Sequence, residues 1–232
     1  MNKVAVITAA SKGMGAASAR ELANAGYKVV LMARSEEIIE LAELLGGKGM
    51  QGSVTNTDDL NALVNLAMGA YGRIDVLVNS TGHPPKGDLL ALTDEQWTDA
   101  SNMVLMNVVR GSRLVTPIMQ KQGGGSIIII STFAAFDPSL KFPLSSIFRT
   151  ALASYAKLFA TEFGGDNIRM NNILPGYIES WPVGEEVLAE IPLGRSGTLE
   201  EIGKTAVFLA SEGAAYITGE NLKVDGGITK NI

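Results

Sequence analysis

Residues 4–15 read VAVITAASKGMG and lead directly into a segment of helical period at 16–25. A buried strand, a glycine-rich turn and a helix in this order bring backbone N–H groups and the positive end of the helix to one point. That point suits the pyrophosphate of a dinucleotide. The stretch therefore predicts the first βα unit of a nucleotide-binding sheet, although a short glycine pattern taken alone also fits an ordinary tight turn.

Short apolar runs rich in β-branched residues alternate with longer helical segments along the rest of the chain. This alternation is typical of βαβ units and predicts a Rossmann-type α/β fold, with a doubly wound parallel sheet and helices on both faces. Ligands of such a sheet bind beyond the carboxyl ends of its strands. We expect one nucleotide-binding domain over 1–232. The expected strands are 4–8, 28–33, 49–51, 74–79, 126–131, 169–174 and 221–224.

Two of the expected helices carry clear start signals. Thr93 with Gln96, and Thr198 with Glu201, have the spacing of a capping box, in which the side chains at both ends of the first turn satisfy backbone N–H groups. These pairs predict helices that begin directly after Thr93 and Thr198.

Composition excludes several classes of function. The formal net charge is −5 and no long run of Lys or Arg occurs, so a small molecule is a better expected partner than nucleic acid or an anionic membrane. The chain has no cysteine and a single histidine, His83, so no metal site is expected. Because the sequence has neither an apolar stretch of membrane-spanning length nor a leader pattern, we expect a cytoplasmic protein.

The end of the second expected strand indicates which dinucleotide binds. In NAD-binding sheets an acidic residue, roughly twenty residues past the glycines, contacts the adenosine ribose. Here Arg34 follows the strand, and Lys12 lies within the glycine-rich loop. Two cations without a carboxylate in this run favour the 2′-phosphate of NADP(H) over NAD(H). The alternative is that both are ordinary solvated charges.

Several segments together resemble the short-chain dehydrogenase/reductase family, in order and spacing across nearly the whole chain. TAASKGMG at 8–15 resembles the family's TGxxxGxG fingerprint, with Ala9 at the first glycine. GRIDVLVNSTG at 72–82 resembles its DVLVNNAG strand, and NNILPGYIES at 171–180 resembles the VNxxxPGxIxT segment that cradles the nicotinamide. Further family landmarks match at 191–195, 207–211 and 224–227.

The resemblance implies an NADP(H)-dependent oxidoreductase that acts on a small carbonyl or alcohol substrate. Ser53 and Val54 stand where the family commonly has Asp-Val against the adenine, so we expect a weaker contact there. The residues that the resemblance assigns to the cofactor are Thr8, Ser11, Lys12, Gly13, Met14, Gly15, Arg34, Ser53, Val54, Asn79, Gly82, Arg149, Pro175, Gly176, Ile178 and Ser180.

All four catalytic positions of the family carry other residues in this chain. Members use a Tyr-x-x-x-Lys pair, in which the cation lowers the tyrosine pKa, together with a serine and an asparagine. The asparagine, serine, tyrosine and lysine positions align with Val104, Thr132, Ser145 and Arg149. Ser145 is a poor proton donor, because the pKa of its hydroxyl lies far above the tyrosine value of about 10. Arg149 can still donate to the nicotinamide ribose.

Other polar residues are candidates for the missing roles. Tyr177 lies beside the expected nicotinamide site and is a candidate proton donor, although an aromatic residue there more often lines the pocket. His83 leaves the fourth strand near the cofactor, but a lone loop histidine is more often solvated. Asn107 stands one helical turn from Val104, where the family usually has glycine. The segment at 181–191 is short and predicts a shallow or open substrate pocket.

Two classes of function therefore remain open. One is an NADP(H)-dependent oxidoreductase of atypical or very low activity, and the other is a non-catalytic cofactor-binding or partner subunit of the same fold. The complete nicotinamide segment at 175–180 favours the first slightly. We also expect a homotetramer or homodimer formed by the helices near 94–120 and 145–163, because the second carries Leu152, Tyr155, Phe159 and Phe163 on a broad apolar face.

Overall fold

Seven parallel strands form one sheet in the computed structural model, which describes residues 3–231. Their order is β3-β2-β1-β4-β5-β6-β7, so the winding direction reverses between β1 and β4. The predicted fold class is confirmed. The strands are β1 (Val4–Thr8), β2 (Lys28–Ala33), β3 (Lys48–Gln51), β4 (Val76–Asn79), β5 (Gly125–Ile130), β6 (Ile168–Pro175) and β7 (Asn221–Val224).

The central strands are apolar along their whole length because helices cover both faces of the sheet. Every residue of β1 is buried, and Val6 of this strand pairs with Val30 of β2 on one side and with Leu77 of β4 on the other. The fourth strand begins at Val76 rather than at the predicted Ile74. Ile74 is instead held by the side chain of Gln122, whose oxygen accepts its backbone N–H at 3.2 Å.

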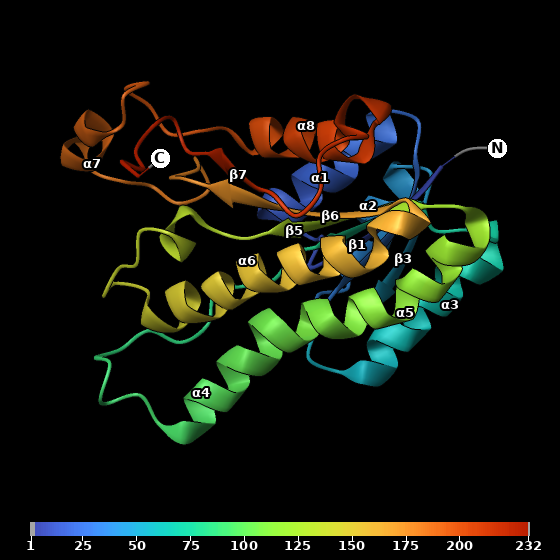
Figure 1. Cartoon of the computed structure of the whole chain (residues 1–232), viewed down its shortest axis with the longest axis horizontal. Coiled ribbons are helices and arrows are strands. Elements are labelled where there is room, and N and C mark those ends of the chain that lie inside the picture. The colour runs from blue at the N-terminus through green and yellow to red at the C-terminus, as the bar shows by residue number, and fades with distance from the viewer. Residues whose placement is uncertain (1–2, 232) are drawn as a thin grey trace.

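Two layers of helices enclose the sheet (Figure 1). One layer holds α1 (Gly13–Asn24), α2 (Glu37–Leu44) and α8 (Leu199–Ala210), and its core includes Leu22, Ile38 and Ile202. The other layer holds α3 (Thr57–Tyr71), α5 (Asn107–Gln122) and α6 (Pro143–Phe163). The two apolar clusters therefore lie on opposite faces of one sheet, as a doubly wound fold requires.

Both capping boxes predicted from the sequence form. The hydroxyl of Thr93 accepts the N–H of Gln96 at the start of α4 (Asp94–Ser101), and that of Thr198 accepts the N–H of Glu201 at the start of α8. Helix α4 continues through a π-helical stretch, Asn102–Met106, into α5. A short helix, α7 (Glu185–Glu190), follows β6 and lies at the carboxyl edge of the sheet (Figure 1).

The part of the chain from 3 to 231 contains no helix that is both long and apolar enough to cross a membrane. Within the same residues, no group of three or more His, Asp or Glu side chains is arranged to hold a metal ion.

Candidate cofactor and substrate site

The turn between β1 and α1 lies at the carboxyl edge of the sheet, beside the point where the winding reverses. A Cβ atom on Gly15 would lie 2.5 Å from the carbonyl oxygen of Ala9, so only glycine fits at this position. Ala9 itself has φ 49°, in the left-handed region that costs an ordinary residue about 1–2 kcal/mol. The replacement of the family's first glycine by Ala9 therefore strains the turn as well as crowding it.

Helix α1 begins at Gly13, which also has a left-handed backbone with φ 59°. The first N–H groups of a helix have no acceptor within the helix, so this end of α1 offers donors and positive potential to a phosphate. Lys12 is exposed at the N-cap, and the half-buried residues of the same turn are Ser11, Gly13 and Met14. The structure thus brings the predicted pyrophosphate residues together.

Thr8, a predicted cofactor residue, forms hydrogen bonds within the protein. Its buried hydroxyl donates to the carbonyl oxygen of Ser80 at 2.8 Å and accepts the N–H of Ser80 at 3.0 Å. These two bonds join the end of β1 to the residue that follows β4. The hydroxyl of Thr8 therefore joins the two strands between which the winding direction reverses.

The adenosine end of the site contains the predicted cations and, in addition, one carboxylate. Arg34 is exposed directly after β2, and its carbonyl oxygen accepts the side-chain amide of Gln51 at 2.7 Å. A hydrogen bond from Ser35 lowers the pKa of Glu37, and the positive charge of Lys12 contributes to this shift. Glu37 lies three residues beyond Arg34, and its negative charge partly offsets the positive charge of Lys12. The prediction from residues 31–34 did not include this carboxylate.

Ser53 and Val54 follow β3, as the alignment with the adenine contact requires. The backbone N–H of Ser53 donates to the Asp59 carboxylate at 2.8 Å, and its hydroxyl bonds to that of Thr55 at 2.8 Å. Val54 is half-buried and packs against the core. Both polar groups of Ser53 are therefore engaged within the protein, consistent with the weaker adenine contact that we expect.

The nicotinamide end is built by the last residues of β4 and β6. A Cβ on Gly176 would lie 2.7 Å from Cα of Asp225, so this glycine permits the close approach of two chain segments. Pro175 and Ile178 are buried, whereas Gly82 and Ser180 are exposed. Asn79 is buried at the end of β4, and neither atom of its side-chain amide has a hydrogen-bond partner among the described residues.

Ser145 and Arg149 occupy one face of α6 at the end of β5. The Nε–H of Arg149 donates to the hydroxyl of Ser145 at 3.2 Å, and an Nη1–H donates to the carbonyl oxygen of Ile130 at 2.6 Å. Thr132 follows two residues after Ile130, and its hydroxyl accepts the N–H of Ala134 at 3.3 Å. The positions assigned to the family's tyrosine and lysine therefore contact each other at the end of β5, and the position of the serine lies two residues beyond that strand.

Arg149 is a buried cation, with only 4% of its surface exposed. Burial lowers the pKa of its guanidinium to about 10. No carboxylate forms an ion pair with it among residues 3–231. Because an isolated buried charge is costly, this arrangement favours an electron-rich ligand, such as ribose hydroxyls or an alkoxide, at the exposed side of the guanidinium.

Two further buried polar side chains, those of Asn107 and Ser131, have no hydrogen-bond partner in the described structure. Val104 lies in the π-helical stretch and is 1% exposed. Asn107, the first residue of α5, is equally buried, and neither of its amide atoms has a hydrogen-bond partner in the described structure. The same holds for the hydroxyl of Ser131, which sequence reasoning did not single out. Buried amides and hydroxyls of this kind are usually satisfied by water or a ligand.

The structure places the two candidate proton donors on the loops around this site. The ring of Tyr177 lies 5.6 Å from that of Phe133 and is half-buried, so it lines the crevice. His83 is exposed and packs edge-on against Trp181 at 5.5 Å. Partial desolvation and the charges of Arg149 and Lys86 lower the pKa of His83, which disfavours the imidazolium form that a general acid needs.

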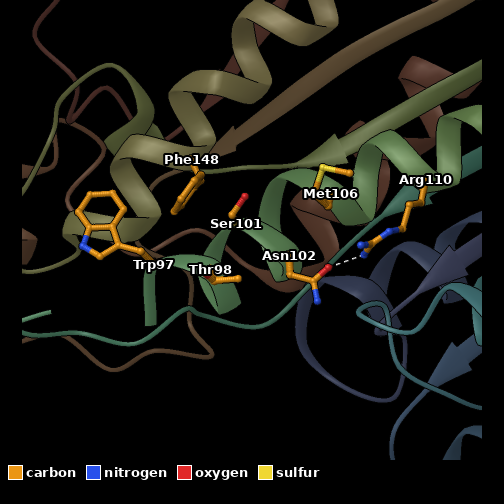
Figure 2. A pocket seen from close by; sticks show the side chains of 7 residues that line it. All are labelled: Trp97, Thr98, Ser101, Asn102, Met106, Arg110 and Phe148. Carbon is orange, nitrogen blue, oxygen red and sulfur yellow. Dashed lines mark hydrogen bonds between the residues drawn. The ribbon is translucent and has the colours of Figure 1, made fainter. Parts of the chain in front are cut away.

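One pocket lies away from this crevice, between α4, the π-helical stretch, the start of α5 and α6 (Figure 2). Its volume is about 580 Å³, and Arg110 reaches across it to bond the side-chain oxygen of Asn102. The residues that line it are Trp97, Thr98, Ser101, Asn102, Met106, Arg110 and Phe148. None of them is a predicted site residue, so the pocket belongs to the helical face rather than to the cofactor crevice.

Comparison with known proteins places this architecture in a family. The family model described as enoyl-(acyl carrier protein) reductase matches residues 8–229. Dehydrogenase/reductase SDR family member 4 of Homo sapiens is 36% identical, over 97% of this chain and 87% of the relative. The 3-oxoacyl-[acyl-carrier-protein] reductase FabG of Escherichia coli is 34% identical, over 97% of both chains. The chain therefore belongs to the short-chain dehydrogenase/reductase (SDR) family, a class of oxidoreductases with a Rossmann-type fold.

Two solved structures are similar to the whole chain. L-sorbose reductase from Gluconobacter frateurii, determined with NADPH and L-sorbose, has a TM-score of 0.92 and 32% identity and covers 100% of this chain and 98% of its own. YwfH, described as an NADPH-dependent reductase involved in bacilysin biosynthesis, has a TM-score of 0.94 at 24% identity and covers 100% of both chains. The second likeness concerns the fold alone.

The residues present fit a nicotinamide dinucleotide. At the phosphate end, the missing side chain of Gly15 leaves space, and the free N–H groups at the start of α1 are donors. At the nicotinamide end, the guanidinium of Arg149 has no ion-pair partner and the side-chain amide of Asn79 has no hydrogen-bond partner in the described structure.

The buried cation yields a direct prediction. We expect Arg149→Met to leave the free energy of unfolding unchanged or higher. The change replaces an unpaired buried charge with an apolar side chain of similar volume. The same change should weaken NADPH binding roughly tenfold or more through the loss of charge-assisted hydrogen bonds. Thermal unfolding and calorimetric titration measure the two effects.

The variant Arg110→Met serves as the control, because Arg110 is half-buried on the helical face away from the crevice, and it should leave the NADPH affinity unchanged. Strong destabilisation by Arg149→Met with unaltered NADPH affinity would show instead that Arg149 is only a structural residue.

Proposed function

We propose that this chain is an NADP(H)-binding reductase of the SDR family that acts slowly, on a small carbonyl or alcohol substrate, because its usual proton donor is replaced. The observation that carries the proposal is the buried guanidinium of Arg149, held between Ser145 and Ile130 at the end of β5. A cation retained there at an energetic cost supports a role toward the cofactor. The NADPH held by the 32% identical sorbose reductase supports the same choice of cofactor.

When bound, NADPH supplies a hydride to a carbonyl carbon, and the carbonyl oxygen then needs a proton. The hydroxyls of Thr132 and Ser145 can donate hydrogen bonds to that oxygen, and the positive charge of Arg149 stabilises it as negative charge develops. A serine hydroxyl has too high a pKa to act as a good acid, so water delivers the proton. Each residue thus keeps a binding or electrostatic role while general acid catalysis is weak.

The second candidate function is a non-catalytic subunit that binds the cofactor. The substitution of all four positions, at Val104, Thr132, Ser145 and Arg149, favours it. It differs from the first candidate in a single measurable respect, the oxidation of NADPH by a carbonyl compound.

Cofactor choice is tested at the adenosine end. We expect NADPH to bind more tightly than NADH, and Arg34→Asp to reverse or abolish this preference through a change of about 1–3 kcal/mol. Glu37→Gln should tighten NADPH binding because it removes the charge that opposes Lys12. Glu40→Gln, at another exposed position of α2, is the matched control. Equal affinity of the unmutated protein for NADPH and NADH would refute the proposed preference.

The catalytic proposal is tested by restoring the family's residues. We expect the unmutated protein to reduce standard ketones about 10²–10⁴-fold more slowly than an enzyme with a positioned general acid. Ser145→Tyr with Arg149→Lys and Thr132→Ser should create measurable NADPH oxidation, and Thr132→Ser alone should not. Absorbance of NADPH follows both reactions.

Ordinary ketone turnover by the unmutated protein would contradict the assignment of these positions. If neither form oxidises NADPH although both bind it, the non-catalytic subunit becomes the better proposal. Addition of Val104→Asn then tests whether the proton relay alone was missing.

We further propose that the chain assembles as a homodimer or homotetramer through α4, α5 and α6. Part of the apolar face expected on α6 packs inward instead, because Leu152 and Phe159 lie in the chain's own core. Ile147 and Leu158 remain 43% and 67% exposed on the same helix. These side chains, together with the pocket of Figure 2, give a second copy an apolar surface to cover.

Light scattering at micromolar concentration should therefore report more than one chain per particle. Leu158→Lys should shift the particle toward the monomer, because it places a charge on the covered surface. Leu44→Lys changes an exposed leucine on α2 in the opposite helical layer and should not. A monomeric unmutated protein would contradict this assembly.

A further inference from the structure

A lysine lies between two aromatic rings at the mouth of the crevice. The ammonium of Lys86 is 4.7 Å from the ring centre of Phe142 and 4.6 Å from that of Trp181. His83 packs edge-on against the same Trp181 at 5.5 Å. We call His83, Lys86, Phe142 and Trp181 the mouth cluster.

The mouth cluster draws on three separate connections. His83 and Lys86 follow β4, Phe142 directly precedes α6, and Trp181 follows β6. In parallel sheets such connections meet above the carboxyl ends of the strands, which is where ligands bind. Figure 1 shows the connections after β4 and β6 and the start of α6 at the same end of the molecule. The cluster therefore lies on the substrate side of the crevice.

Two cations, Lys86 and Arg149, lie near this mouth. Lys86 forms no ion pair with a carboxylate in the described chain, and neither does Arg149 below it. The charged groups that influence His83 are Arg149 and Lys86, both cations. Lys86 is exposed, so water accepts its N–H groups while the ring faces orient the ammonium. An anion placed there would replace this water and form a charge-assisted hydrogen bond.

We propose that the mouth cluster selects a substrate that bears a carboxylate, which pairs with the ammonium of Lys86 while the rings of Phe142 and Trp181 cover the apolar part of the same molecule. The substrate class is thus an oxo acid, or its hydroxy acid product, with the carbonyl carbon below the cluster near Thr132 and Ser145. This inference rests on the proposed function. It goes beyond it in naming the acidic group and the residue that binds it.

Calorimetric titration with benzoylformate and with its neutral methyl ester tests the inference without requiring turnover. On the protein loaded with NADP⁺, the acid should bind about tenfold more tightly than the ester, since a charge-assisted bond is lost in the ester. Lys86→Met should remove this difference, whereas Lys86→Arg should retain most of it. Lys141→Met, next to Phe142 but outside the mouth cluster, should leave it unchanged.

Titration of NADP⁺ into each variant separates the two proposals. The inference stands if NADP⁺ binds Lys86→Met and the unmutated protein equally well, while benzoylformate binds the unmutated protein more tightly than Lys86→Met. If the acid and the ester bind the unmutated protein equally, or neither binds while NADP⁺ does, it is overturned. If NADP⁺ itself does not bind, the proposed function fails, and the same titrations on the protein alone decide the role of Lys86.

Discussion

The close approach between α1 and the end of β1 is the constraint on which the rest of the crevice depends. A side chain at Gly15 would lie 2.5 Å from the carbonyl oxygen of Ala9, so the helix can start this near the sheet only with glycine there. Thr8, one residue earlier, ties the end of β1 to Ser80 after β4. These neighbouring residues therefore fix the start of the helix and the junction of β1 with β4 together. They do so despite the strain of a left-handed Ala9.

The other end of the crevice depends on a buried charge rather than on close packing. Arg149 keeps a cation at the end of β5, but the partner that it holds is the hydroxyl of Ser145, which is a far weaker acid than a phenol. In the proposed reductase, binding and proton transfer, which one pair of residues usually combines, are thus separated. The proposed reductase and the proposed binding subunit share this geometry and differ only in whether water can complete the reaction.

Features that depend on short stretches of sequence were predictable. The strand and helix of the first βα unit, and the capping boxes at Thr93 and Thr198, follow from residues a few positions apart, and the structure confirms them. The expected apolar face of α6 was less informative, because periodicity shows that Leu152 and Phe159 are buried but not whether a second copy or the chain's own core buries them.

Features that join distant loops could not be predicted in the same way. Glu37 lies near Lys12, and Lys86 lies between Phe142 and Trp181, only because separate connections meet at one edge of the sheet. A local sequence pattern does not predict contacts between residues of different connections. The roles assigned to Thr132, Ser145 and Arg149 came from alignment with a family. The structure adds the hydrogen bond between Ser145 and Arg149, which the alignment alone did not show.

A crystal structure with NADP⁺ and an oxo acid bound is the most direct test of the central claim, that the cofactor site is kept while the protein's own acid is lost. The quantity to measure is the distance from the ligand's carbonyl oxygen to each side-chain donor. We predict that Arg149 contacts the ribose and that only the hydroxyls of Thr132 and Ser145, and water, lie within hydrogen-bond distance of that oxygen. A phenol from Tyr177 or a protonated His83 at that distance would contradict the account.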